Sequence, residues 1–190
     1  MAFEDLIWLF SQGETTRNII RINIAEGVLL YKTAKKVCQT SNHRTCATLV
    51  EIGRKYGGST ALLASVMTPY DNLYSIDIVM HEQVNANLAT AGVSHLVNLV
   101  TGDSKYVGKK WTRPIDLIFI DGDHSYRGVK SDIEVWLHHV KPFGYALFHD
   151  VIGKKEELTP LMSKLQEEDW RKTDEADTTL CLQRIPKLRR

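Results

Sequence analysis

The sequence predicts an α/β domain in which helices cover both faces of a mostly parallel β-sheet. From Thr48 onward, short apolar runs alternate with longer amphipathic stretches, which is the pattern of repeated β–α–β units. Residues 117–120 form a continuous apolar run bounded by acids, as is typical of a parallel strand buried on both faces. A chain of 190 residues with 43% hydrophobic residues is long enough to bury the core of one such domain.

The strand expected at Ile115–Ile120 lies in the middle of the sheet, because it is apolar on both faces. The other expected parallel strands are 48–52, 73–78, 97–101 and 145–148. The helices expected between the strands are 59–67, 81–91, 129–140 and 155–167. Strands at 170–173 and 179–185, joined by a polar turn, would form a hairpin and complete a seven-stranded sheet whose last strand is antiparallel to its neighbours.

Residues 1–45 are expected to form a helical extension that precedes the main domain, residues 46–190. Apolar residues at helical spacing predict one helix over 3–10 and a longer helix that Thr15 or Thr16 caps and that runs through Val37. The second helix has one wide apolar face. The sequence leaves three roles for these helices open. They cover the rim of a site as a lid, they pair with a second copy of the chain as a homodimer, or they pack on the core.

Charge and cysteine content exclude several classes of protein. The 24 basic and 23 acidic residues leave a formal net charge of +1, so no overall field favours nucleic acid or a membrane surface. The basic tail at 187–190 is interpreted as a solvated terminus. Three cysteines without metal-binding spacing, no segment that resembles a cleavable signal and no apolar run long enough to cross a bilayer together predict a cytoplasmic protein.

A glycine-rich loop, LVEIGRKYGGST at 49–60, joins the first expected strand to a helix, an arrangement that brings backbone N–H groups close to an anionic ligand. A dinucleotide fingerprint needs a second glycine where Lys55 stands, and the lysine side chain would crowd the turn. A nucleotide-phosphate loop needs a lysine where Ser59 stands. The loop therefore disfavours dinucleotides and ATP, and it suits a nucleoside that carries a carboxylate.

Acids and histidines follow the expected strands at one edge of the sheet, where open α/β sheets bind their ligands. Asp77 closes the second strand 24 positions after Gly53, about where an acid meets ribose hydroxyls in nucleotide folds. Each acid taken alone is equally well explained as a helix cap or a solvated turn, but their common register predicts a site. The other strands end in Asp103 and Ser104, in Asp121, Asp123 and His124, and in His149 and Asp150.

Together these segments resemble the class I S-adenosylmethionine-dependent methyltransferases, and within them the small-molecule branch called methyltransferase family 24. The resemblance lies in VEIGRKYGGST, LYSIDI, VTGDS, IDLIFIDGDHSYRGVKSDIEVW and GYALFHD. It implies a Rossmann-like sheet with a C-terminal antiparallel hairpin, and S-adenosylmethionine as the cofactor. By this resemblance the methionine part is held at Glu51, Gly53, Gly57, Gly58 and Ser59, the ribose at Asp77, and the adenine at Asp103 and Ser104, with Asp121 completing the cofactor site.

Methyl transfer to oxygen requires an acceptor hydroxyl to lose its proton while it lines up behind the methyl group. His124 is the expected general base, beside Asp121; the alternative is that His124 only caps or orients the following helix. The resemblance to cation-dependent O-methyltransferases implies that Asp121 and Asp150 bind Mg²⁺ or another divalent cation. Val151 stands where that group carries a metal-binding asparagine, so either His149 compensates or the metal is absent.

The expected activity is therefore methylation of a hydroxyl on a small molecule. Nucleic-acid amino-methyltransferases carry a proline-rich tetrapeptide where this chain has residues 121–124, so a nucleic-acid substrate is not expected. Two alternatives remain. One is a non-catalytic cofactor-binding or interaction module on the same fold, and the other is a dinucleotide-dependent oxidoreductase, which Lys55 disfavours.

Overall fold

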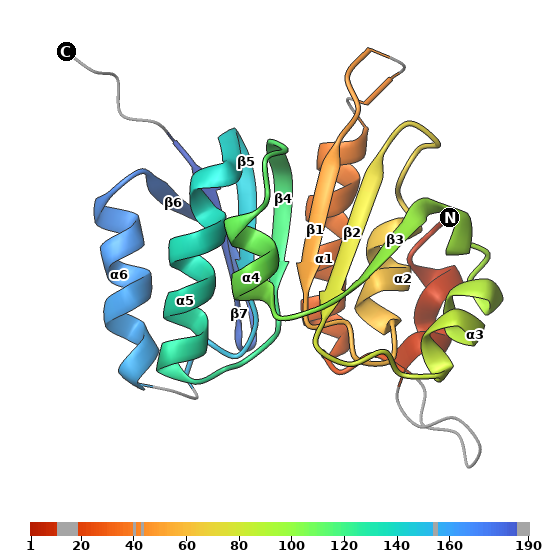
Figure 1. The fold of residues 1–190 in the computed structure, drawn as a ribbon, viewed down its shortest axis with the longest axis horizontal. Helices are drawn as coiled ribbons and strands as arrows, with labels where there is room; N and C mark the ends of the chain where they lie inside the picture. Colours follow the sequence, from red (N-terminus) through yellow and green to blue (C-terminus); the bar gives the residue numbers. More distant parts are fainter. Residues whose placement is uncertain (11–18, 40, 43, 154–155, 186–190) are drawn as a thin grey trace.

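The computed structural model describes residues 1–10, 19–39, 41–42, 44–153 and 156–185, and Figure 1 shows their fold. One seven-stranded sheet has the order β3-β2-β1-β4-β5-β7-β6. All neighbouring pairs are parallel except those of β7, which runs antiparallel to both β5 and β6. The strands are β1 (Thr48–Ile52), β2 (Asn72–Asp77), β3 (Val97–Thr101), β4 (Ile115–Ile120), β5 (Val140–Phe148), β6 (Trp170–Ala176) and β7 (Thr179–Arg184).

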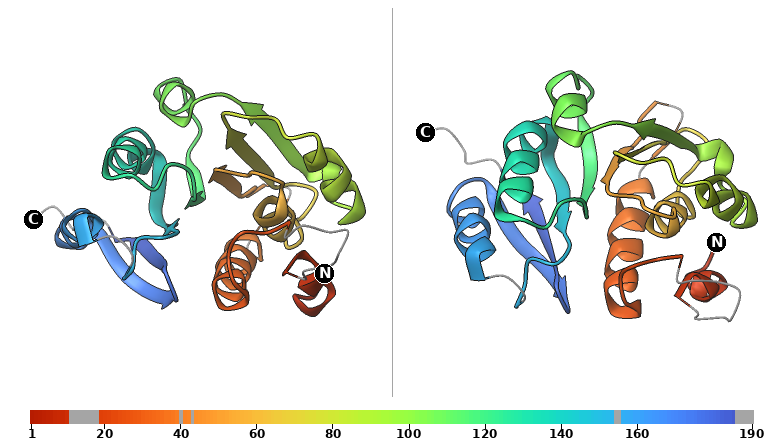
Figure 2. Two further views of the ribbon diagram at one scale, coloured as in Figure 1. Left: turned by 90° about the horizontal axis from the view of Figure 1, so that it is seen from below. Right: turned by 60° about the horizontal axis from the view of Figure 1, so that its bottom comes forward.

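Two layers of helices enclose the sheet, as the two views of Figure 2 show. The α-helices are α1 (Ile24–Cys38), α2 (Gly58–Ala64), α3 (Gln83–Thr90), α4 (Ser104–Lys109), α5 (Tyr126–Trp136) and α6 (Thr159–Glu167). The 3₁₀ helices are η1 (Glu4–Phe10), η2 (Ser94–Leu96), η3 (Leu137–His139) and η4 (Glu156–Leu158). The helices η1, α1, α2 and α3 cover one face, and α4, α5 and α6 cover the other.

The strands supply both hydrophobic clusters because successive side chains of a strand point to opposite faces. In β4, Leu117 and Phe119 pack with α1 and α2, whereas Ile118 and Ile120 pack with α5 and α6. All four side chains are buried. The expected mid-sheet strand is thus confirmed, and so is the C-terminal hairpin of β6 and β7.

The prediction for the N-terminal helices is partly wrong. The first helix is a 3₁₀ helix, and the second begins at Ile24, although it was expected to begin near Thr15 or Thr16, which lie outside the described residues. Asn23 sets the start of α1, because its side chain accepts a hydrogen bond from the Glu26 N–H while the Glu26 carboxylate accepts one from the Asn23 N–H. Ile19 and Ile20 are buried but precede the helix.

Other boundaries also differ from the prediction. The short helix α4 was missed; Asp103 caps it, its side chain accepting a hydrogen bond from the Lys105 N–H. The fifth strand begins at Val140 rather than at 145, and an irregularity in its pairing with β4 separates this start from the apolar run. The expected helix start at Lys155 and the basic tail at 187–190 lie outside the described residues.

The helix α1 packs within the same core as the sheet, with Leu30 and Ala34 fully buried. The division of the chain near residue 45 stays a prediction, as does a homodimer. Cys38, Cys46 and Cys181 are free thiols, and Cys46 alone of the three is exposed. Within the described residues, every helix is too short or too polar to cross a bilayer.

The strands β1 and β4 come into close contact just beyond their last residues. Gly53 has a φ of +88°, and a Cβ at this position would lie 2.1 Å from the carbonyl oxygen of Asp121. The Asp121 N–H donates to the Ile52 carbonyl at 2.8 Å, which continues the pairing of the two strands. Only glycine combines this backbone conformation with this approach.

Replacement of Gly53 by alanine is expected to destabilise the fold strongly, since the new methyl group overlaps a backbone that cannot move without breaking the sheet. Gly92→Ala is a matched control, because Gly92 has a φ of +71° but no atom within 4 Å of the added Cβ. The control should lose about 1–2 kcal/mol from backbone strain alone, and Gly53→Ala at least about 2 kcal/mol more. Denaturant unfolding of both variants measures this, and equal losses would contradict the close contact.

Candidate functional site

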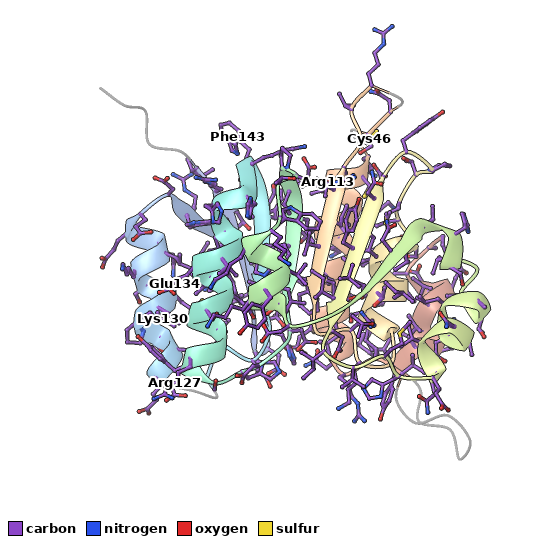
Figure 3. The ribbon with its side chains drawn as sticks, in the orientation of Figure 1. Cys46, Arg113, Arg127, Lys130, Glu134 and Phe143 are labelled. Carbon is purple, nitrogen blue, oxygen red and sulfur yellow. The ribbon has the colours of Figure 1, made fainter. Side chains whose placement is uncertain are left out.

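A cavity of about 880 Å³ opens at the C-terminal ends of β1, β2 and β4. These strand ends lie at the lower edge of the sheet in Figure 1. The size of the cavity lies near the upper end of the range for small-molecule sites. The side chain of Arg127, which lines it, lies at the lower end of α5, while Cys46 and Phe143 lie at the opposite end of the sheet (Figure 3). The ligand site expected at the carboxyl ends of the strands therefore coincides with a real cavity.

The loop after β1 forms one wall of the cavity. Lys55 stands where a dinucleotide fingerprint has its second glycine, and it adopts a φ of 45°, in the left-handed region. Its N–H donates to Asp77 Oδ2 at 2.9 Å and its side chain is exposed. Beneath the loop, the buried Arg54 guanidinium donates to the carbonyl oxygens of Ser75 at 2.7 Å and Val100 at 2.8 Å, which ties the loop to the ends of β2 and β3.

Six of the residues predicted for the cofactor line the cavity, and three do not. Glu51, a residue of β1, is fully buried, and its carboxylate accepts hydrogen bonds from the hydroxyls of Thr60 and Ser75. Burial raises the pKa of Glu51 to about 6, and these hydroxyls only partly offset the effect. The six that line the cavity are Gly53, Ser59, Asp77, Asp103, Ser104 and Asp121.

The two glycines that lie away from the cavity lining are explained by the protein itself. Gly57 has a φ of +83°, a backbone conformation that favours glycine, and it faces the side chains of Val84 and Leu88. A Cβ on Gly58 would lie 2.5 Å from the Cα of Ile20, so the N-terminal segment passes directly over this glycine. The spacing of the glycines in the sequence does not distinguish contact with a ligand from contact with the chain itself.

Asp77 is held at the cavity wall by two backbone N–H groups, those of Lys55 and of Val79, the latter at 3.0 Å. At the far side, Ser104 Oγ donates to Asp132 Oδ1 at 2.6 Å. Burial raises the pKa of Asp132 to about 6, against the opposing effect of this hydrogen bond. Asp132 was not among the predicted site residues, because an acid within a helix carries no signal of its own.

Asp121 lies between two imidazole rings at the rim. Its Oδ1 is 2.7 Å from His149 Nδ1 and 3.5 Å from His124 Nε2. The His149 ring then continues the chain of contacts, because its Nε2 lies 3.5 Å from Glu26 Oε2 and 3.6 Å from Asp150 Oδ1. The structure thus brings together all four residues predicted for catalysis or metal binding and adds Glu26.

Glu26 belongs to α1 and is almost fully buried. Its Oε1 accepts hydrogen bonds from the hydroxyls of Thr178 at 2.7 Å and Thr179 at 3.0 Å, at the start of β7. The pattern Asn-x-x-Glu at 23–26, a capping box, was the available signal for this residue, but it predicts only a helix start. The contact of Glu26 with His149 depends on the tertiary structure and does not follow from this pattern.

The charges of this cluster support one another. Burial raises the pKa of Glu26, but hydrogen bonds from His149, Thr178 and Asn23 outweigh it and bring the value to about 2. Burial lowers the pKa of His149, but hydrogen bonds to Asp121 and Glu26 and the charges of Asp121 and Asp150 raise it to about 10. His149 is therefore an imidazolium at neutral pH.

The side chains do not fit the magnesium site expected from the sequence. Mg²⁺ prefers oxygen ligands, whereas the group of described residues whose ligand atoms lie within 4.8 Å of one another is Asp121, His124 and His149. The second expected carboxylate, Asp150, accepts a hydrogen bond from Thr178 Oγ1 at 2.9 Å. The His149 ring lies between the two carboxylates that were expected to share the ion.

This architecture, a sheet with a single antiparallel strand and a cavity at its carboxyl edge, is that of the class I S-adenosylmethionine-dependent methyltransferases. A family profile described as a methyltransferase domain matches residues 50–151. The chain belongs to this family, methyltransferase family 24.

One curated protein matches part of the chain. Uncharacterized protein R132 of Acanthamoeba polyphaga mimivirus is 31% identical over an alignment of 113 residues, and the match covers 54% of this chain and 51% of that protein. The chain thus spans about half the length of this curated relative.

Solved structures share the fold at low identity. A methyltransferase from Geobacter sulfurreducens aligns with a TM-score of 0.72 and 18% identity, over 96% of this chain and 89% of that one. The O-methyltransferase TomG from Streptomyces achromogenes, solved with S-adenosylmethionine, aligns with a TM-score of 0.67 and 18% identity, over 87% and 82%. These likenesses concern the fold.

The stability that His149 contributes should depend on pH. Its pKa is higher in the folded protein, at about 10, than the ordinary 6.5, so the contribution is complete below pH 6.5 and is lost as the pH rises toward 10. The difference in unfolding free energy between the wild type and His149→Gln should therefore shrink by a few kcal/mol across this window. Denaturant titrations measure it, with the exposed His95→Gln as control, and a difference that stays constant with pH would contradict the charged pair.

Proposed function

We propose that the protein transfers a methyl group from S-adenosylmethionine to a hydroxyl group of a small molecule. The observation that carries the proposal is the placement of His124, next to Asp121, on the wall of a cavity that also contains Gly53 and Asp77. The protein belongs to a family that uses this cofactor, which supports the same activity. A basic side chain where the reacting end of the cofactor is expected supports it as well. The O-methyltransferase TomG, which has the same fold, gives the proposal its reaction class.

The residues around the cavity suit this cofactor. The glycine turn at Gly53 lets the backbone approach a ligand closely. Each Asp77 oxygen accepts one backbone hydrogen bond and keeps a lone pair for a ribose hydroxyl. Ser104 and Asp132 form the polar wall on which we place the adenine. When bound, S-adenosylmethionine supplies an electrophilic methyl group on its sulfonium.

The two histidines at the rim take different roles in this proposal. His149 is buried and, with its pKa raised to about 10, has both ring nitrogens protonated at neutral pH, so it cannot act as the base. The side chain of His124 is 31% exposed toward the cavity and can reach an acceptor hydroxyl. Asp121 faces both rings, so it orients His124 and stabilises the imidazolium that forms when His124 takes the proton. The divalent cation expected from the sequence stays a prediction, and no step here depends on it.

A small acceptor suits the cavity better than a polymer does. The formal net charge of +1 offers no general attraction for a nucleic acid. The acceptor would enter beside His124, because the wall formed by Asp77 and Ser104 is assigned to the nucleoside. The non-catalytic alternative predicts cofactor binding without product, and assays with a labelled methyl donor and panels of phenols, sugars and short RNAs separate these outcomes.

Substitution of Asp77 by asparagine should weaken binding of S-adenosylmethionine about 10-fold or more, because a charged acceptor for the ribose hydroxyls is lost. Isothermal titration calorimetry with S-adenosylmethionine or its demethylated product measures the change. Asp174→Asn, at an exposed position of β6, is the matched control and should bind as the wild type does. Unchanged affinity in Asp77→Asn would remove Asp77 from the cofactor site.

Substitution of His124 by alanine should lower kcat by about 10²–10⁴-fold, the usual contribution of a general base, while cofactor affinity stays unchanged. A labelled-methyl transfer assay on the acceptor found in the panel gives the rate, and calorimetry gives the affinity. His95→Ala is the matched control, since His95 is exposed and lies outside the residues that line the cavity. Normal turnover in His124→Ala would leave His124 with a structural role only.

A further inference from the structure

The His149 side chain lies in a ring of carboxylates that comes from three separate parts of the chain. Glu26 reaches it from α1, Asp121 from the end of β4, and Asp150 from its own loop after β5. The distances to the ring nitrogens are 3.5, 2.7 and 3.6 Å, respectively. His124 faces the group from the other side of Asp121, with its ring centroid 5.6 Å from that of His149.

Buried carboxylates need a positive partner, because an unpaired charge out of water is costly. The side chain of Glu26 is only 3% exposed and that of Asp121 only 11% exposed. Among the residues that the structure describes, the cations that pair with these two carboxylates are histidines rather than lysines or arginines. His149 is the buried one and contacts both.

We propose that His149 is a built-in cation, which occupies the place among Glu26, Asp121 and Asp150 where a related enzyme would hold a divalent metal ion, so that this protein binds no metal there. The ring fixes Asp121 in the orientation that serves His124. His149 is thus a positioning residue, and Glu26 positions it in turn.

The competing arrangement is a metal ion bound by Asp121, His124 and His149, whose ligand atoms lie within 4.8 Å of one another. Two ligands about 2.1 Å from one ion are about 3.0 Å apart in octahedral geometry and about 3.4 Å apart in tetrahedral geometry. The observed separation of His149 Nδ1 and Asp121 Oδ1 is 2.7 Å, a hydrogen-bond distance. The other ring nitrogen, Nε2, lies 3.5 Å from Glu26 Oε2 and 3.6 Å from Asp150 Oδ1, so both nitrogens face carboxylates.

The inference rests on the proposed function only in that the site is taken to serve methyl transfer, and metal binding can be measured without turnover. Chelator-treated full-length protein is titrated calorimetrically with Mn²⁺ and with Zn²⁺. The wild type should show no metal binding that depends on Asp121, so its titrations and those of Asp121→Asn should be the same. His149→Asn should bind Mn²⁺ at least tenfold more tightly than the wild type, because three carboxylates then surround a vacated space. His95→Asn is the matched control and should behave as the wild type does.

Two further variants make the test specific. The double variant Glu26→Gln/His149→Asn should bind Mn²⁺ more weakly than His149→Asn, since one carboxylate is gone. His149→Lys, which restores a positive charge, should gain no Mn²⁺ affinity. If His149→Asn does not fold, the wild-type titration decides, because it needs no variant at position 149.

Asp121-dependent binding of Mn²⁺ or Zn²⁺ to the wild type would overturn the proposal, and so would a folded His149→Asn protein that gains no affinity. Methyl transfer that persists in the presence of chelator would support it. Failure of S-adenosylmethionine to bind would refute the proposed function and leave these metal titrations unaffected, so the two failures are distinguishable.

Discussion

The buried ion pair between His149 and Glu26 is the contact on which the candidate site depends. It joins α1 to the end of β5, and the hydroxyls of Thr178 and Thr179 anchor the same carboxylate to β7. Removal of one partner from a buried pair typically costs about 3–5 kcal/mol, because the other charge stays behind without compensation. The pair is therefore a strong constraint on how α1 sits against the sheet.

This constraint also explains why the rim can be preorganised. Asp121 is fixed from one side by His149 and from behind by the contact between its own carbonyl group and Gly53. In the proposed mechanism, a carboxylate that is held in this way does not need to reorient when charge develops on His124, and preorganisation of this kind lowers the barrier. The helix α1 lies outside the residues that match the family profile, yet it helps to fix the position of Asp121 inside them.

Most of the sheet could be predicted from the sequence, because each parallel strand contains a short, mainly apolar run. The central strand Ile115–Ile120 and the C-terminal hairpin follow directly from such runs. The short helix α4 and the true start of α1 were missed, because they depend on single capping residues, Asp103 and Asn23, within otherwise weak patterns. Local hydrogen bonds of this kind leave little trace in hydrophobic periodicity.

Site residues that lie near strand ends in the sequence could be predicted, whereas those that reach the site only through tertiary contacts could not. Asp77, Asp121 and His124 lie at or shortly after the ends of strands, so their positions at one edge follow from the topology. Glu26 and Asp132 come from α1 and α5, which pack on opposite faces of the sheet, and only the tertiary structure shows that they reach the site. Conversely, Gly58, the first residue of α2, belongs to a glycine pattern that the sequence assigns to the ligand, whereas its missing side chain makes room for the backbone of Ile20.

The passage of the N-terminal segment over Gly58 makes that segment a structural part of the cavity. Ile19 and Arg21 line the same cavity as Gly53 and Ser59, so residues that precede the matched domain help to shape it. Under the proposed function, substitutions in this segment alone would change which acceptors fit the cavity, without any change in the loop after β1.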